Sequence, residues 1–61
     1  METRQYRVII TYITLDGKKR SHTTLWYFSP IEAWNEAHRY EDFNSHKWSE
    51  SSAGISSRKV Y

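Results

Sequence analysis

A predicted strand meets a predicted helix in Leu25-Trp26-Tyr27-Phe28-Ser29-Pro30-Ile31-Glu32-Ala33-Trp34. Ser29 suits the N-cap, Pro30 has the φ angle of a first helical residue, and Glu32 stands three residues after Ser29, as in a capping box. The residues before Ser29 are β-branched and aromatic, which is typical of a strand. The chain is therefore expected to change from strand to helix within one or two residues.

Upstream of this junction the sequence predicts a β-hairpin. Residues 6–15 are rich in Val, Ile, Tyr and Thr, and Asp16-Gly17 is a strong signal for a two-residue turn. The chain then returns antiparallel over residues 18–28, with Leu15 opposite Lys18. This register places Tyr6, Val8, Ile10, Tyr12, Ser21, Thr23, Leu25 and Tyr27 on one face, and Arg7, Ile9, Thr11, Ile13, Arg20, His22, Thr24 and Trp26 on the other, with Phe28 at its end.

Downstream of the junction a helix is expected over residues 30–44. Its 3.6-residue period groups Ala33, Ala37 and Tyr40 on a narrow apolar stripe, flanked by Trp34. Two alanines allow a helix to approach a sheet closely. The stripe is expected to pack on the sheet face that carries Val8, Ile10, Leu25 and Tyr27.

After the helix, residues 45–54 are expected to form a serine-rich polar loop, and residues 55–61 a short third strand. A disordered tail is the alternative, because serine-rich charged segments are often mobile. The expected fold class is α+β, with an antiparallel β-hairpin and a short third strand packed on one helix in the order β-β-α-β. The 61 residues form a single small domain, near the lower size limit for a core.

Composition bears on the cellular location of the chain and on its charge distribution. It has no cysteine, no apolar run long enough to span a membrane and no signal-peptide h-region in Met1-Glu2-Thr3-Arg4-Gln5, so a cytoplasmic location without membrane contact is expected. The formal net charge of +2 is unevenly spread. Basic residues collect in the predicted strands and acidic residues in the helix, so a basic sheet and an acidic helix are expected.

No motif predicts an enzyme. The chain has no Gly-x-Ser-x-Gly elbow and no Gly-rich phosphate loop, so no catalytic residue and no cofactor are expected. His38, Asp42 and His46 are spaced four apart, but they fall on the face of the helix that is predicted to meet solvent. No metal site is therefore expected.

The sheet face that the helix leaves uncovered is the predicted binding site. Its apolar and aromatic side chains are bordered by cations, which is typical of a binding or self-association surface. The candidate partner-binding residues are Arg7, Ile9, Ile13, Lys18, Arg20, His22, Trp26 and Phe28. The expected partner is an acidic macromolecule, a protein in the main interpretation, with nucleic acid and a homodimer through the sheet as alternatives. The competing interpretation is that strand twist, the loop over residues 45–54 and the terminal Tyr61 cover much of this face.

The order of predicted elements over residues 6–61 resembles that of small phage proteins that inhibit host machinery, such as the small phage inhibitor of bacterial RNA polymerase and some anti-CRISPR proteins. The resemblance is carried by Asp16-Gly17, by Ser29-Pro30-Ile31-Glu32-Ala33 and by residues 55–60. It implies a phage-encoded protein that occupies a surface of a larger host partner. Residues 6–40 are also similar to the AP2-like arm-binding domains of integrases, which implies DNA reading by the sheet.

Overall fold

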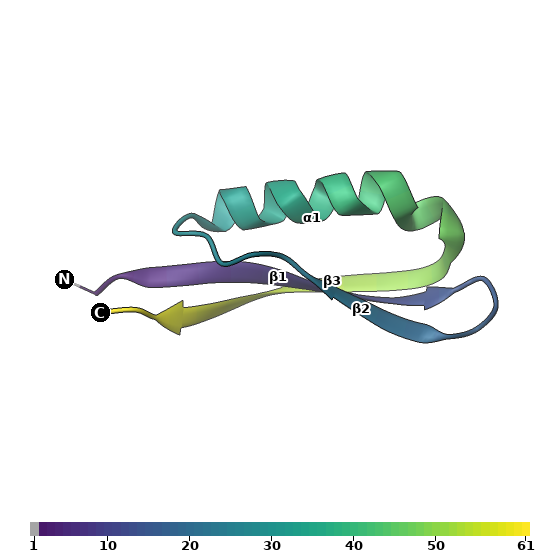
Figure 1. The fold of residues 1–61 in the computed structure, drawn as a ribbon, viewed down its shortest axis with the longest axis horizontal. Helices are drawn as coiled ribbons and strands as arrows, with labels where there is room; N and C mark the ends of the chain where they lie inside the picture. The colour runs from purple at the N-terminus through teal and green to yellow at the C-terminus, as the bar shows by residue number, and fades with distance from the viewer. Residues whose placement is uncertain (1) are drawn as a thin grey trace.

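The computed structural model describes residues 2–61, which form one sheet and one long helix. The elements are β1 (Arg4–Thr14), β2 (Lys19–Thr23), α1 (Pro30–Asn44), the 3-10 turn η1 (Ser45–Lys47) and β3 (Trp48–Lys59). The strands are antiparallel in the order β2-β1-β3. Helix α1 runs along one face of the sheet, and the termini lie at the end opposite the hairpin turn (Figure 1). The predicted α+β class and β-β-α-β order are confirmed.

The core lies between α1 and β1 and is small. Val8, Ile10, Ala33 and Ala37 are completely buried. Six half-buried aromatic side chains surround them, namely Tyr6, Tyr12, Tyr27, Trp34, Tyr40 and Trp48. The two alanines of the predicted stripe let α1 approach the sheet closely, and the large rings close the sides of the core.

The start of α1 agrees with the sequence in its backbone but not in its side-chain cap. Ser29 is the N-cap in extended conformation, and Pro30 follows it in the first turn. The Ser29 side chain makes no capping hydrogen bond, so the predicted capping box with Glu32 is wrong. The Ser29 carbonyl accepts the Ala33 N–H at 3.3 Å. The helix therefore begins through backbone geometry and the fixed φ of Pro30.

The hairpin loop contains three residues where two were predicted. Thr14 N–H donates to the Lys18 carbonyl at 2.8 Å, which closes the loop around Leu15-Asp16-Gly17, and Gly17 has a φ of 88°. A three-residue loop with glycine in the left-handed region is a standard hairpin connection. It shifts the register by one, so that Tyr12 pairs with Arg20 and Ile10 with His22. The predicted faces of Ser21, Thr23, Arg20 and His22 are therefore wrong, and Arg20 and His22 fall on the helical side of the sheet.

A bulge then restores the predicted register. Thr24 N–H donates to the Val8 carbonyl at 3.0 Å, and Tyr27 and Tyr6 exchange two backbone hydrogen bonds, at 2.6 and 2.8 Å. Tyr27 follows Thr24 by three residues, whereas Val8 follows Tyr6 by only two, so the side of the pair with Thr24 and Tyr27 contains one extra residue. The Thr24 hydroxyl fills the gap by accepting the Val8 N–H at 2.9 Å. Thr24 is 4% exposed and Leu25 is 70% exposed, so the prediction that Leu25 packs under the helix is wrong. The extra residue turns Leu25 outward, as bulges commonly redirect side chains.

Strand β3 is much longer than predicted. The sequence indicated a polar loop over residues 45–54 and a strand over 55–61, whereas β3 pairs with β1 from Thr14↔Trp48 to Arg4↔Lys59. One irregularity occurs, between Ile13 and Thr14. Most β3 side chains are exposed, so the sequence of β3 does not alternate between apolar and polar residues as a half-buried strand would. Backbone hydrogen bonding to β1 holds the strand in place.

Candidate functional site

The sheet face away from α1 is here called the open face, and within residues 2–61 no helix or loop crosses it (Figure 1). Strand register assigns to it Gln5, Arg7, Ile9, Thr11, Ile13, Lys19, Ser21, Thr23, Glu50, Ser52, Gly54, Ser56 and Arg58. Ile9 and Ile13 are half-buried among serine, threonine and glycine. The open face is thus a narrow apolar line along β1, with small polar side chains on both sides.

A cluster of one tryptophan and two arginines occupies the end of this face near the termini. The Arg7 guanidinium carbon lies 4.4 Å from the centroid of the Trp26 ring, and that of Arg58 lies 4.1 Å from it. Arg58 also donates two hydrogen bonds to the Gln5 side-chain oxygen, at 2.9 and 2.7 Å. The predicted neighbours Arg7 and Trp26 do meet. Arg58, which comes from β3, was not predicted to join them.

This contact changes the role of Trp26. The ring is half-buried, and Arg58 of the C-terminal strand contacts it, so Trp26 does not present a bare apolar surface. The ring instead holds two cations in position by cation–π attraction.

The two guanidinium groups carry uncompensated charge. Within residues 2–61 the ion pairs are Arg4 with Glu2 and Lys18 with Asp16, so Arg7 and Arg58 have no carboxylate partner. The Arg7 Nε atom is shielded from solvent and has no hydrogen-bond partner among these residues. Guanidinium donors without partners favour carboxylate or phosphate ligands.

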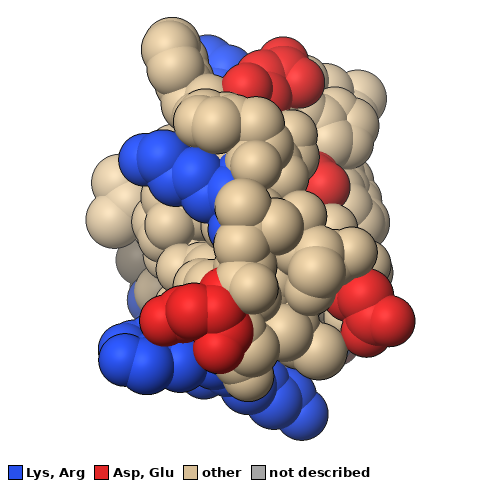
Figure 2. Space-filling model, turned by 90° about the vertical axis from the view of Figure 1, so that its right-hand side faces the viewer, with Lys and Arg blue, Asp and Glu red and all other residues tan. Residues whose placement is uncertain are grey.

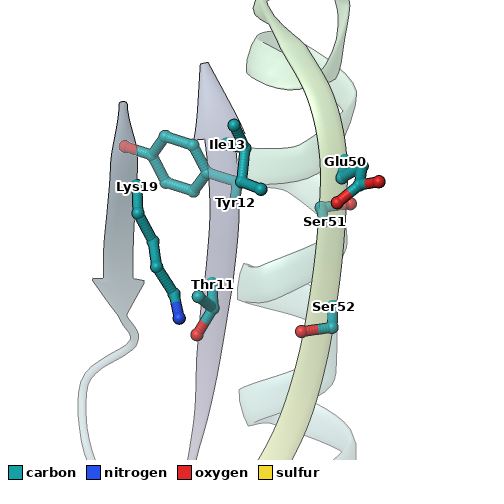
Figure 3. Close-up of a pocket in the computed structure, with 7 residues that line it drawn as sticks. All are labelled: Thr11, Tyr12, Ile13, Lys19, Glu50, Ser51 and Ser52. Atoms are coloured by element: carbon teal, nitrogen blue, oxygen red, sulfur yellow. The ribbon is translucent and has the colours of Figure 1, made fainter. Parts of the chain in front are cut away.

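The hairpin half of the open face contains a shallow depression of about 210 Å³. Figure 3 shows Thr11 and Ile13 from β1 between Lys19 of β2 and Ser52 of β3, with Glu50 on the outer side of β3. Lys19 extends along the sheet toward Thr11 (Figure 3). The depression is open to solvent and is lined mainly by hydroxyl side chains, with one cation and one carboxylate.

The sheet and the helix differ in charge. The open face carries Arg7, Lys19 and Arg58 against Glu50, whereas α1 carries Glu32, Glu36, Glu41 and Asp42 against Arg39. Figure 2, seen from the hairpin end, shows one group of Lys and Arg side chains at the bottom, on the side away from the helix, and others nearer the helix. The predicted basic sheet and acidic helix are confirmed. An acidic partner would be attracted to the open face.

The structure brings together only part of the predicted partner-binding set. Arg7, Ile9 and Ile13 share the open face, and Lys18 stands exposed in the turn beside it. Arg20 and His22 lie on the other side of the sheet, where the His22 ring stacks on Tyr40 with 3.7 Å between centroids. Phe28 is 63% exposed in the link to α1, outside the strands.

Glu36 has a role that its sequence position did not reveal. Its carboxylate accepts the Tyr27 hydroxyl and the Leu25 N–H, the latter at 3.2 Å. The Tyr27 hydrogen bond to this carboxylate raises the pKa of Tyr27 above its usual value, with burial and the negative charge of Glu36 adding to the effect. Glu36 thus ties the bulge to α1 and fixes the segment that carries Trp26.

Among residues 2–61 no three His, Asp or Glu side chains converge as a metal site would require, and none of the helices there is both long and apolar enough to cross a membrane. Comparison with known proteins finds no matching family model, no matching curated protein and no matching solved structure.

Proposed function

We propose that this chain is a non-enzymatic binding protein that attaches to an acidic macromolecular partner through the open face. The observation that carries the proposal is the pair of guanidinium groups on Trp26, which have no carboxylate partner in residues 2–61. Binding an anionic group there would satisfy donors that the fold leaves free.

A protein is the partner that these features favour. Ile9 and Ile13 give the middle of the open face an apolar line, and apolar centres with charged surroundings are typical of protein interfaces. Lys19 and the two arginines would steer an acidic surface toward this line. As in the phage inhibitors that the chain resembles, the contact would cover a surface of a larger host protein.

Nucleic acid is the second candidate, because Lys18, Lys19 and Arg20 concentrate positive charge at the hairpin end. Phosphate contacts from such residues give binding that weakens steeply with salt. Base stacking on Trp26 is disfavoured, since two guanidinium groups already contact that ring.

Site-specific photocrosslinking tests the proposal. A benzophenone amino acid at Thr11, in the middle of the open face, should form protein adducts in cells of the natural host, whereas the same probe at exposed Asn35 on α1 should not. Lys19→Glu should reduce the Thr11 adducts, and the charge-matched control Arg39→Glu should leave them. Absence of adducts from Thr11, or equal adducts from both positions, would refute the proposal.

A gel-shift experiment separates the two candidates. Random duplex and single-stranded DNA should not be retarded at low salt if the partner is a protein. Retardation that disappears as salt rises would favour nucleic acid, because released counterions oppose binding at high salt.

A further inference from the structure

The two edges of the sheet differ sharply in their protection. The β2 edge is short, carries Lys19 and Arg20, and ends in the bulge, all of which discourage pairing with another strand. The β3 edge is 12 residues long, and its middle section, residues 51–57, contains no charge and no proline. A long unprotected edge of this kind is a template for a further strand.

The hydrogen-bonding pattern identifies which β3 groups are free. Tyr6 and Val8 of β1 form backbone hydrogen bonds with Tyr27 and Thr24, in the segment that continues from β2. The odd-numbered residues of β1 therefore direct their backbone N–H and C=O groups toward β3. Their partners include Ser52, Gly54 and Ser56. The alternate residues of β3 therefore turn their N–H and C=O groups outward, and these are Ser51, Ala53, Ile55 and Ser57.

We propose that two copies of this chain pair through their β3 edges, antiparallel about a two-fold axis at Gly54, to form a continuous six-stranded sheet. In this register Ala53 pairs with Ile55 of the other copy and Ser51 with Ser57, so that all outward groups of residues 51–57 find partners. The inference does not rest on the proposed function. Both open faces remain uncovered in the dimer, and Arg7 and Lys19 stay available to an acidic partner while Arg58 faces Glu50 of the other copy.

Charge complementarity supports this register. Pairing about Gly54 sets Glu50 of each copy opposite Arg58 of the other, and both lie on the open face. Glu50 has no ion-pair partner within residues 2–61, and its side chain lies on the outer side of β3 (Figure 3). Opposite charges directly across an antiparallel pair stabilise it.

Two features near the axis also fit a second backbone. Ile55 is 44% exposed on the helical side of the sheet. The two-fold axis places it directly opposite Ala53 of the other copy and diagonally opposite Ile55 of the other copy. Nothing lies within 4 Å of a Cβ built on Gly54, so packing within the chain does not require glycine there. Glycine inside a strand often marks close approach of another backbone.

Sedimentation velocity over a concentration series at low salt tests the inference. The wild-type chain should form a dimer. Ala53→Pro removes one outward N–H per copy, two in the dimer, and should weaken dimerisation by about 30-fold while the monomer keeps its circular dichroism. A wild-type chain that stays monomeric at high concentration would overturn the inference.

Charge variants test the register even if Ala53→Pro fails to fold. Glu50→Lys alone and Arg58→Glu alone place like charges opposite each other and should each be monomeric. An equal mixture should dimerise, because each variant then supplies the charge that the other lacks. The control Asp42→Lys on α1 should dimerise as the wild type does. A mixture that stays monomeric, or single variants that dimerise normally, would contradict pairing about Gly54.

Discussion

Replacing Thr24 with valine removes one hydroxyl from the sheet and keeps the shape of the side chain. That hydroxyl accepts the Val8 N–H at 2.9 Å and donates to the Leu25 carbonyl at 3.0 Å. Val8 is completely buried, so its N–H cannot turn to water, and an unsatisfied buried donor costs about 1–3 kcal/mol. Leu25 is exposed, so water can replace the bond to its carbonyl.

We therefore expect Thr24→Val to lower the free energy of unfolding by about 2 kcal/mol. With an unfolding entropy of about 2.1 cal/mol/K per residue, this corresponds to a fall in melting temperature of roughly 15 °C for a chain of 61 residues. Urea unfolding followed by tryptophan fluorescence measures the change, and the slope m should stay constant.

The matched control is Thr23→Val, at the neighbouring exposed position, which should change stability by less than about 0.5 kcal/mol. Thr24→Ser keeps the hydroxyl and should retain more stability than Thr24→Val. Equal stability of Thr24→Val and the wild type would show that the Thr24 hydroxyl does not support the bulge, and the account of the register change would be wrong.

Substitutions at Gly17, Ala37 and Glu36 test other parts of the fold. Gly17→Val should destabilise the hairpin by about 1–2 kcal/mol and Gly17→Asn by less in thermal melts, because φ is 88° and asparagine tolerates it better; equal losses would contradict this. Ala37→Leu should cost about 1–3 kcal/mol by overpacking the helix–sheet contact in urea unfolding, with exposed Asn35→Leu as the nearly neutral control. Tyr27 should ionise at higher pH than a free tyrosine in ultraviolet titration, and Glu36→Gln should lower its pKa. Since the folded pKa is the raised one, the Tyr27 contribution is complete below pH 10.0, the ordinary tyrosine value, and is lost as the pH rises through the folded value; an unchanged titration in Glu36→Gln would exclude this coupling.

Short sequence signals were sufficient to predict the helix start, the buried helix stripe and the position of the hairpin turn. Pro30 fixed the helix start, the spacing of Ala33 and Ala37 identified the buried stripe, and Asp16-Gly17 located the turn. Loop length was not decided by that dipeptide, because glycine with positive φ serves two-residue and three-residue loops equally. The one-residue error moved Arg20 and His22 to the wrong face, as a register slip must.

The missed features depend on contacts between distant segments. Thr24 looks like any strand threonine, and only the pairing of Tyr27 with Tyr6 creates the gap that its hydroxyl fills. β3 lacks an alternating pattern because it is an edge strand with few buried side chains. Arg58 could join Trp26 in a prediction only after β3 had been aligned with β1. The sequence therefore placed Arg7, Ile9 and Ile13 together on one face as the structure does, but it did not place Arg58 beside Trp26.

The pairing of β1 with β3 has a consequence for how the chain folds. The hairpin forms contacts between segments that are close in sequence, whereas Arg4 must meet Lys59 across nearly the whole chain. Contacts between distant segments slow folding, because the intervening chain must first lose entropy. Docking of β3 is therefore the expected rate-limiting event. Until it occurs, the inner edge of β1 is available to other chains, so folding yield should fall as protein concentration rises.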